Sequence, residues 1–190
     1  MPATRFETLP RSPSRTDIAS ITQTEGDLIV HSAWMGEQLV WLGLAWVKDG
    51  AESVHAKAQR ALPHCNFIPT ADTGQTGRIM TAWRANRLND LPMTLFGTPF
   101  QHKVWQALLA LAPLERPTYG QIAARIGNQK ACRAVGTAVG SNPITLLVPC
   151  HRILPHAGGV GNYGWGAPMK GYLLALEDKA YAAATTGRAA

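Results

Sequence analysis

The apolar pattern of this chain changes near its middle, and that change limits the folds it can adopt. In the first half, residues 25–46 (EGDLIVHSAWMGEQLVWLGLAW) hold two apolar, β-rich runs around a Met-Gly-Glu turn, which is typical of a β-hairpin. Helical apolar spacing follows in 50–62 and 73–88, and LPMTLF at 91–96 predicts another strand. The sequence therefore predicts a small α+β domain over residues 23–96.

The second half opens with a clear helix start. Thr98 is a suitable N-cap, and Pro99 suits the first helical position, where its missing N–H would have no partner anyway. The predicted helix carries four apolar residues on one face, the usual core stripe: Phe100, Val104, Leu108 and Leu111. We accordingly place a boundary near residue 97 and a second domain over residues 97–180.

Length and composition set the outer bounds. A chain of 190 residues with 46% hydrophobic and 16% charged residues is long enough for one domain or two small ones. Residues 1–22 lack a hydrophobic segment and predict a loose tail, and residues 181–190 are expected to be frayed. No apolar run approaches the roughly 18 residues of a membrane span. Three cysteines offer no disulfide framework, so we expect a soluble, reduced, cytoplasmic monomer.

Charge is distributed unevenly between the halves. Residues 1–96 hold nine Lys or Arg and nine Asp or Glu, whereas residues 97–190 hold nine Lys or Arg and three Asp or Glu. A surface of one sign is what binding to a polyanion such as nucleic acid requires. A solvated basic surface without a partner explains the same charge, so charge alone leaves both interpretations open.

Residues 118–142, TYGQIAARIGNQKACRAVGTAVGSN, predict a helix-turn-helix. Thr118 can cap a short helix through Ile126, a Gly-Asn pair interrupts it, and a second helix begins near Gln129. Two short helices around a glycine-containing turn form this motif, although any α-hairpin shares the pattern.

The second of these helices is slim. From 131 to 140 it consists almost wholly of small residues, and Arg133 is its only long side chain. A core helix normally carries Leu, Ile or Phe, so packing alone explains this composition poorly. The minor groove of DNA is about 6 Å wide, against about 12 Å for the major groove. The pattern therefore indicates a helix that approaches the minor groove closely and pushes Arg133 toward the base stack.

The stretch ITLLVPCHRIL, residues 144–154, places Cys150, His151 and Arg152 in succession after an apolar run. Free thiols are often small core hydrophobes, and adjacent side chains point in different directions, so adjacency does not make a catalytic pair. A nucleophilic thiol must ionise, and with an ordinary pKa of about 8.5 it needs a neighbouring base. On these residues alone, Cys150 is either a nucleophile or a core residue.

The segment VPCHRIL follows an SNP tripeptide and the slim helix, and GNYGWG and LLALE come after it. With these spacings, residues 90–178 resemble the O6-alkylguanine-DNA alkyltransferases, also called methylated-DNA–protein-cysteine methyltransferases. The first half resembles the family's smaller N-terminal domain in length and pattern only. The resemblance implies an α+β protein with a small ribonuclease-H-like N-terminal α/β domain and a winged-helix-like C-terminal domain that contains the helix-turn-helix.

The resemblance also implies a reaction. Cys150 accepts the alkyl group of O6-alkylguanine in double-stranded DNA and keeps it, so each molecule acts once. His151 takes the thiol proton through a bridging water, and Glu177 orients the imidazole, as the third member of other nucleophile triads does. No cofactor is implied, and no metal is expected because the chain has no C-x-x-C motif.

The remaining implied roles concern DNA. An O6 adduct is reached by flipping the nucleotide out of the stack, at an unstacking cost of a few kcal/mol. Tyr119 is implied to assist extrusion and to donate to guanine N3, and Asn142 to tie the helix-turn-helix to the active-site turn. Arg152 is expected to pin the loop. The residues implied to contact DNA or the flipped guanine are Arg133, Tyr163, Gly164, Ile153, Ala131 and Gly136.

Individual roles are implied for several of these. Arg133 fills the vacated space, Tyr163 stacks on the guanine, and the Gly164 N–H faces O6. The carbonyls of Cys150 and Ile153 are implied to accept from the guanine amino group.

Alternatives remain in three classes. A DNA-binding regulator and a protein that recognises lesions without repairing them share the helix-turn-helix, but lesion-recognising relatives lack the cysteine that this chain has at Cys150. A Cys-His hydrolase leaves the slim helix unexplained. Activity on O4-alkylthymine is open. The size of the alkyl group that fits is open as well, because Thr145 stands where many relatives have a proline that forms a wall of the alkyl pocket. Trp165 is given no role.

Overall fold

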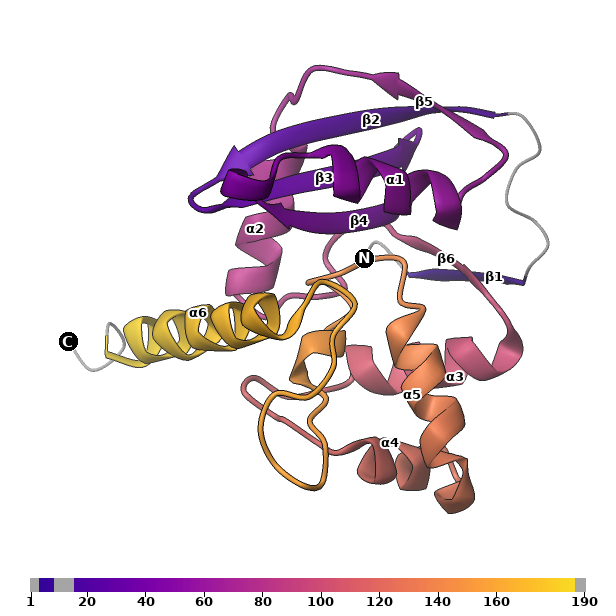
Figure 1. Cartoon of the computed structure of the whole chain (residues 1–190), viewed down its shortest axis with the longest axis vertical. Helices are drawn as coiled ribbons and strands as arrows, with labels where there is room; N and C mark the ends of the chain where they lie inside the picture. Colours follow the sequence, from indigo (N-terminus) through magenta and orange to yellow (C-terminus); the bar gives the residue numbers. More distant parts are fainter. Residues whose placement is uncertain (1–3, 9–15, 187–190) are drawn as a thin grey trace.

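A computed structural model describes residues 4–8 and 16–186 and shows a sheet-based first half and a helical second half (Figure 1). The four-stranded sheet lies at one end of the molecule, and the short helices of the second half gather at the other. This is the mixed α+β architecture that the sequence predicts. No helix of the described residues is long and apolar enough to cross a membrane.

The main sheet consists of β2 (Thr16–Glu25), β3 (Leu28–Met35), β4 (Gln38–Trp46) and β5 (Cys65–Pro69). Its strand order is β4-β3-β2-β5, with antiparallel pairing from β2 to β4 and a parallel pairing of β5 with β2. Gly36 has a φ of 56° in the two-residue turn between β3 and β4, a conformation that glycine adopts without a Cβ clash. The hairpin predicted over residues 25–46 is confirmed.

The other elements of the first half are α1 (Glu52–Ala61), α2 (Gln75–Arg84), and the short parallel pair of β1 (Arg5–Thr8) with β6 (Thr94–Gly97). Both helices and the strand near residue 94 agree with the predicted segments. Val54 and Ala58 of α1 belong to a buried cluster built on the sheet. Ile79 of α2 belongs to a larger cluster that also contains Val104 of the second half, so the two halves share a core.

The start of the chain differs from the loose tail predicted over residues 1–22. β2 begins at Thr16, and Ile18 and Ile21 are only 1% and 2% exposed. β2 lies between β3 and β5 and is buried by partners that are distant in sequence, which local composition does not reveal. Residues 1–3 and 9–15 lie outside the described part of the chain.

The second half contains α3 (Pro99–Leu109), α4 (Tyr119–Arg125), α5 (Cys132–Gly140) and α6 (Ala167–Thr186), with one-turn 3-10 helices at Gln129–Ala131 and Cys150–Arg152. Thr98 caps α3 and Thr118 caps α4, each in a capping box with the glutamine three residues on. Three residues of the predicted α3 stripe are buried, and Phe100 is half-buried. The predicted helix-turn-helix is confirmed as α4, the 3-10 turn and α5.

The end of the chain also differs from the prediction of a frayed tail over residues 181–190. α6 continues to Thr186, although residues 181–186 are all exposed. Alanine has the highest helix propensity, so this alanine-rich segment extends the helix without packing against a neighbour. Residues 187–190 lie outside the described part of the chain.

Candidate active site

Cys150 begins a one-turn 3-10 helix at the end of a buried loop. The loop residues 144–148 are at most 1% exposed, and Leu146 among them has a φ of 70°. The left-handed region costs a residue with a Cβ roughly 1–2 kcal/mol, so this backbone is held there by the packing around it. Cys150 itself is 5% exposed, at the edge of the core rather than on the open surface.

Asn142 connects the end of α5 to the cysteine loop. Its Nδ2 donates to the Val148 carbonyl at 2.8 Å and lies 3.0 Å from Cys150 Sγ, while its Oδ1 accepts from the Ile144 N–H at 2.9 Å. The Tyr163 hydroxyl lies 3.8 Å from the same sulfur. Donors directed at a sulfur favour the thiolate over the thiol. The predicted tie between the helix-turn-helix and the active-site turn is therefore present in the geometry.

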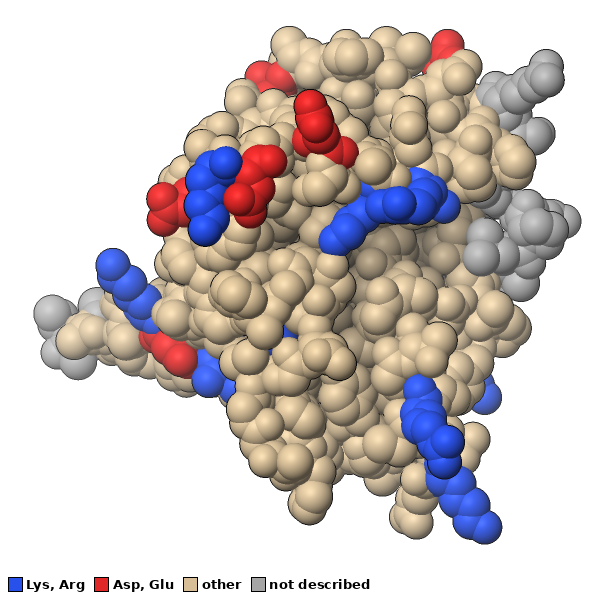
Figure 2. Space-filling view, in the orientation of Figure 1, with Lys and Arg blue, Asp and Glu red and all other residues tan. Residues whose placement is uncertain are grey.

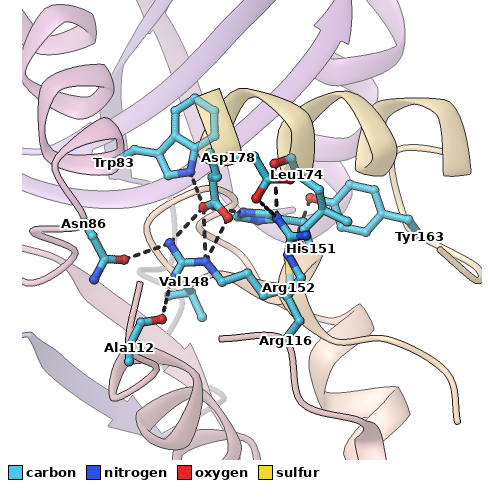
Figure 3. Close-up of polar contacts among 12 residues, drawn as sticks. Trp83, Asn86, Ala112, Arg116, Val148, His151, Arg152, Tyr163, Leu174 and Asp178 are labelled. Atoms are coloured by element: carbon cyan, nitrogen blue, oxygen red, sulfur yellow. Dashed lines mark hydrogen bonds and ion pairs between the residues drawn. The ribbon is translucent and has the colours of Figure 1, made fainter. Parts of the chain in front are cut away.

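Beside the thiol lies a buried polar cluster of His151, Arg152 and Glu177, none of them more than 6% exposed. Nε2 of His151 is 2.9 Å from Glu177 Oε1. Arg152 donates from Nε to both carboxylate oxygens, at 3.1 and 3.0 Å, and from Nη2 to Oε1 at 2.8 Å. The guanidinium and the imidazole thus share this one carboxylate, and Figure 3 shows how the Arg152 and His151 side chains lie. Arg152 thus fixes Glu177 as well as the loop.

Two residues of the first half complete the cluster. Trp83 of α2 donates its indole N–H to Glu177 Oε1 at 2.9 Å, and Arg152 Nη2 donates to Asn86 Oδ1 at 2.7 Å (Figure 3). Buried charges are tolerated only when they are paired and hydrogen-bonded, and each charge here has such partners. The carboxylate is therefore held from both halves of the molecule.

These contacts shift the pKa of three groups. Burial raises the pKa of Glu177, but hydrogen bonds and charge from His151 and Arg152 outweigh it and bring the value to about 2. Burial lowers the pKa of His151, yet Cys150 and Glu177 together hold it above its usual value. For Cys150, burial raises the pKa, but His151, with help from Asn142 and Tyr163, brings it below the usual value. The site therefore favours a thiolate paired with an imidazolium.

The two ring nitrogens of His151 have different surroundings. Nε2 faces a carboxylate, which only accepts, so Nε2 carries the proton in the neutral ring. Nδ1 is buried and makes no hydrogen bond within the described part of the chain. The lone pair that can accept a proton is therefore on Nδ1.

Cys150 forms part of the wall of a cavity of about 370 Å³, within the range of small-molecule sites. The wall comes from α4, α5, the loop and the segment after it, and includes Tyr119, Gly136, Asn142, Tyr163, Gly164 and Trp165. A Cβ at Gly136 would lie 3.8 Å from the Tyr119 ring, so the absence of a larger side chain on α5 keeps this wall open. Six of the predicted site residues thus meet around one cavity.

The slim helix α5 has two distinct faces. Val135, Ala138 and Val139 are buried and supply part of the core, whereas Arg133 is exposed. Lys130, in the preceding turn, is exposed as well. Figure 2 shows basic side chains projecting at the lower end of this helix with no acidic side chain beside them. Small residues therefore serve packing on one face and leave a basic face on the other.

Comparison with known proteins identifies the family. The model of the 6-O-methylguanine DNA methyltransferase DNA-binding domain matches residues 99–179. A methylated-DNA–protein-cysteine methyltransferase of Mycobacterium tuberculosis is 45% identical over 116 residues, which are 60% of this chain and 70% of that protein. The crystal structure of the M. tuberculosis O6-methylguanine methyltransferase has a TM-score of 0.66 at 34% identity and covers 85% of this chain and 93% of that one. This chain belongs to the methylated-DNA–protein-cysteine methyltransferase family.

Two further relatives define the extent of the likeness. M. tuberculosis OGT in complex with DNA matches with a TM-score of 0.66 at 33% identity, over 85% of this chain and 94% of that one. A methylated-DNA–protein-cysteine methyltransferase of Haemophilus influenzae is 47% identical over 93 residues. Those residues are 49% of this chain and 52% of the relative, so the match spans about half the length of that methyltransferase.

Some residues implied by the methyltransferase resemblance lie away from the cavity wall. Ile153 is fully buried, and its carbonyl already accepts from the ammonium group of Lys170. Ala131 is half-buried in the turn before α5. Glu177 lies within α6 rather than at the end of a helix, and its burial distinguishes it from a solvated helix-end residue.

Several residues of this site are missed by sequence reasoning. Trp83 and Asn86 precede Glu177 and Arg152 by 94 and 66 positions, and no spacing rule connects them. Trp165, which has no predicted role, donates its indole N–H to Thr145 Oγ1 at 2.8 Å and lines the cavity. Thr145 stands where many relatives have a proline, and its hydroxyl offers the acceptor that proline lacks.

Candidate metal ligands are not grouped in the described part of the chain. Among the described residues, no three His, Cys, Asp or Glu side chains are placed together as a metal ion requires. Cys132 and Cys150 are free thiols.

Proposed function

We propose that this chain repairs DNA by moving the alkyl group of O6-alkylguanine onto its own Cys150, once per molecule. The observation that carries this proposal is the position of the thiol: Cys150 forms part of the cavity wall and lies next to the buried His151–Glu177 pair. A thiol in that place has a cavity for an electrophile on one side and a base for its proton on the other.

The proton leaves first. Nδ1 of His151 accepts the proton of Cys150 Sγ through a bridging water, and Glu177 stabilises the resulting imidazolium through Nε2. The sulfur then attacks the alkyl carbon, a C–S bond forms, and the C–O6 bond breaks with its electron pair going to the guanine. Tyr119 donates to guanine N3 as this charge develops. The product is a thioether, which no group in the site can cleave, so the reaction stops after one event.

Reaching the lesion requires the nucleotide to leave the stack. α5 approaches the minor groove with its small outer residues, among them Ala131 at its entry and Gly136, and Arg133 fills the vacated space. Tyr163 stacks on the extruded guanine, the Gly164 N–H faces O6, and the carbonyls of Cys150 and Ile153 accept from the amino group. For Ile153 this is a second bond on an oxygen that Lys170 already uses. O4-alkylthymine is a further candidate substrate.

The same proposal extends to the fold. Three antiparallel strands with a fourth joined in parallel to the first favour a ribonuclease-H-like first domain, and α4 and α5 favour a winged-helix-like second domain, with the boundary near residue 97. We place the protein in the cytoplasm as a monomer bound to double-stranded DNA, without a cofactor or a metal.

Intact-mass analysis tests the proposal directly. The protein is mixed with duplex DNA that carries one O6-methylguanine, and peptide mapping follows. The expected result is a gain of one methyl group on the Cys150 peptide that saturates at one equivalent, its loss in Cys150→Ser, and its retention in Cys132→Ser. Tight lesion binding without a mass gain would instead support a lesion-recognition protein, and repeated turnover would support a hydrolase.

A further inference from the structure

One side chain of the first half contacts a segment that lines the active-site cavity. Lys57 lies on α1, yet its Nζ donates to the Gly164 carbonyl at 2.5 Å, across 107 positions of sequence. The same ammonium lies 4.0 Å from the centre of the Trp165 ring. Lys57 also lines a second cavity of about 450 Å³ between the halves, which shares Gly164 and Trp165 with the cavity at Cys150. Figure 2 shows basic side chains at the position of α1 beside a hollow.

The segment that Lys57 contacts, residues 158–166, is here called the lid. Four of its glycines, Gly158, Gly159, Gly161 and Gly166, have φ between 66° and 90°, conformations that other residues rarely adopt. A glycine-rich segment has many alternative conformations, so a single one persists only where contacts select it. Within the lid the Gly166 N–H bonds to the Tyr163 carbonyl at 2.9 Å, which closes a turn around Gly164.

Contacts from outside hold three consecutive lid residues. Tyr163 lies against the thiol at 3.8 Å, and Trp165 is held by Thr145 at 2.8 Å and by the edge of Trp41, with ring centres 6.0 Å apart. Gly164 has no side chain, and Lys57 donates a hydrogen bond to its carbonyl. Lys57 is therefore the charged contact that joins the first half to the part of the lid facing the cavity.

We propose that Lys57 is a positioning residue that clamps the lid over the cavity at Cys150. A hydrogen bond from an ammonium and a cation–π contact to the next ring act on adjacent residues, so together they fix the peptide that separates Tyr163 from Trp165. The first domain thereby sets how the lid meets a flipped base. This inference rests on the proposed alkyl transfer for its rate effect, while its effect on the lid is measurable without DNA.

The same lysine has a competing explanation as a contact to a DNA phosphate. Arg60 lies one turn further along α1 and lines the second cavity, and no hydrogen bond joins it to the lid among the described residues. A phosphate-binding role predicts lower DNA affinity and a reduced salt dependence when Lys57 is neutralised. A clamp predicts slower transfer from DNA that is already bound.

Three variants of the full chain separate these explanations. Lys57→Met keeps the apolar stem and removes the charge and the donor, Lys57→Arg restores both, and Arg60→Met is the matched control. Single-turnover methyl transfer is measured at saturating duplex DNA that carries O6-methylguanine, DNA affinity is measured by titration, and amide hydrogen exchange of Gly166 is measured in the free protein.

The clamp predicts that Lys57→Met slows transfer at saturating DNA by about tenfold, the loss of roughly one charged hydrogen bond. In Lys57→Met the Gly166 amide should exchange about tenfold faster, and DNA affinity should stay within about twofold of the wild type. Lys57→Arg should recover most of the transfer rate and of the Gly166 protection, and Arg60→Met should match the wild type in both. Wild-type transfer and exchange in Lys57→Met would overturn the proposal, as would a loss of affinity alone. If the wild type methylates no cysteine, the proposed function fails, and the exchange measurement still decides on the clamp.

Discussion

The two sides of Cys150 are built differently. On the buried side, His151, Arg152 and Glu177 are almost completely enclosed, and their charges are paired with one another. On the cavity side, Tyr119 and Tyr163 are only half-buried. The cavity side also depends on small residues and a glycine-rich lid, whereas the buried side depends on interlocking hydrogen bonds from both halves.

This difference separates what prepares the thiol from what receives the substrate. The buried cluster exists in the free protein, so its interactions contribute to folding and to the ionisation of the thiol at the same time. The half-buried groups of the cavity are open to solvent, so a ligand can replace water as their hydrogen-bond partner. Substitutions on the buried side should therefore change stability and reactivity together, and substitutions on the cavity side should change reactivity alone.

The largest effect is expected for Glu177→Gln. The change leaves the Arg152 guanidinium short of its counter-charge in a buried site and removes the anion that supports the His151 imidazolium. We expect the free energy of unfolding to fall by about 3 kcal/mol and transfer to slow by at least about 100-fold. Urea unfolding and single-turnover assays measure the two quantities. A rate loss at unchanged stability would contradict the distinction between the two sides, since it would show that the buried cluster does not support the fold.

The same carboxylate gives the stability a defined pH dependence. The folded-state pKa of Glu177 is about 2, against an ordinary value of 4.5. Because the folded state lowers this pKa, its contribution is fully present above about pH 4.5 and is lost as the pH falls toward 2. The contribution at neutral pH is about 3 kcal/mol. Unfolding measured from pH 6 to pH 2 should show this loss in the wild type and not in Glu177→Gln.

Arg133→Ala tests the basic face of α5. Arg133 is exposed and contributes little to folding, so stability should stay within about 0.5 kcal/mol. Transfer from duplex DNA should slow about 10- to 100-fold, because filling the vacated space offsets part of an unstacking cost of a few kcal/mol. Lys130→Ala is the control, with a reduced salt dependence of binding and a smaller rate loss. Equal effects of the two changes would argue that Arg133 contributes only its charge.

Tyr119→Phe removes a single hydroxyl from the cavity wall. The ring that faces Gly136 stays, so the free energy of unfolding should not change by more than about 0.5 kcal/mol. Loss of one donor to the departing guanine should slow transfer by about tenfold. The rate is measured at saturating DNA to separate it from binding. A stability loss comparable to that of Glu177→Gln would show that Tyr119, like the buried cluster, supports the fold.

Trp83→Phe should have the smallest effect on the transfer rate, and it should lower stability as well. The change removes the indole N–H that donates to Glu177 and leaves an aromatic ring in the core. We expect a loss of about 1 kcal/mol in unfolding free energy and a rate reduction of two- to threefold at about neutral pH, since His151 and Arg152 still hold the carboxylate. Thermal unfolding and single-turnover rates measure both. An unchanged transfer rate with reduced stability would show that Trp83 contributes to folding and not to transfer.

Local sequence features predict much of the second half. Thr98 and Thr118 start their helices through capping boxes, and hydrogen bonds within one turn of the chain need no distant partner. The hairpin of β3 and β4 is predictable for the same reason, since a two-residue turn joins strands that are adjacent in sequence. The identity of Cys150, His151 and Glu177 as candidates came from their spacing in a known family pattern.

The helices, turns and strands of this protein can largely be predicted from its sequence, because caps, turns and periodic burial depend on neighbours within a few residues. The sequence also shows which side chains are present for the chemistry of the site. Tertiary structure alone decided that Thr16 starts a strand, that Trp83 and Asn86 support the acidic cluster, and that Lys57 reaches the lid. Each of these depends on segments that the shared core brings together. Burial there strengthens the hydrogen bonds and charge interactions between the paired groups. Such a contact has no fixed spacing along the chain, so the pairing becomes visible only in the folded molecule.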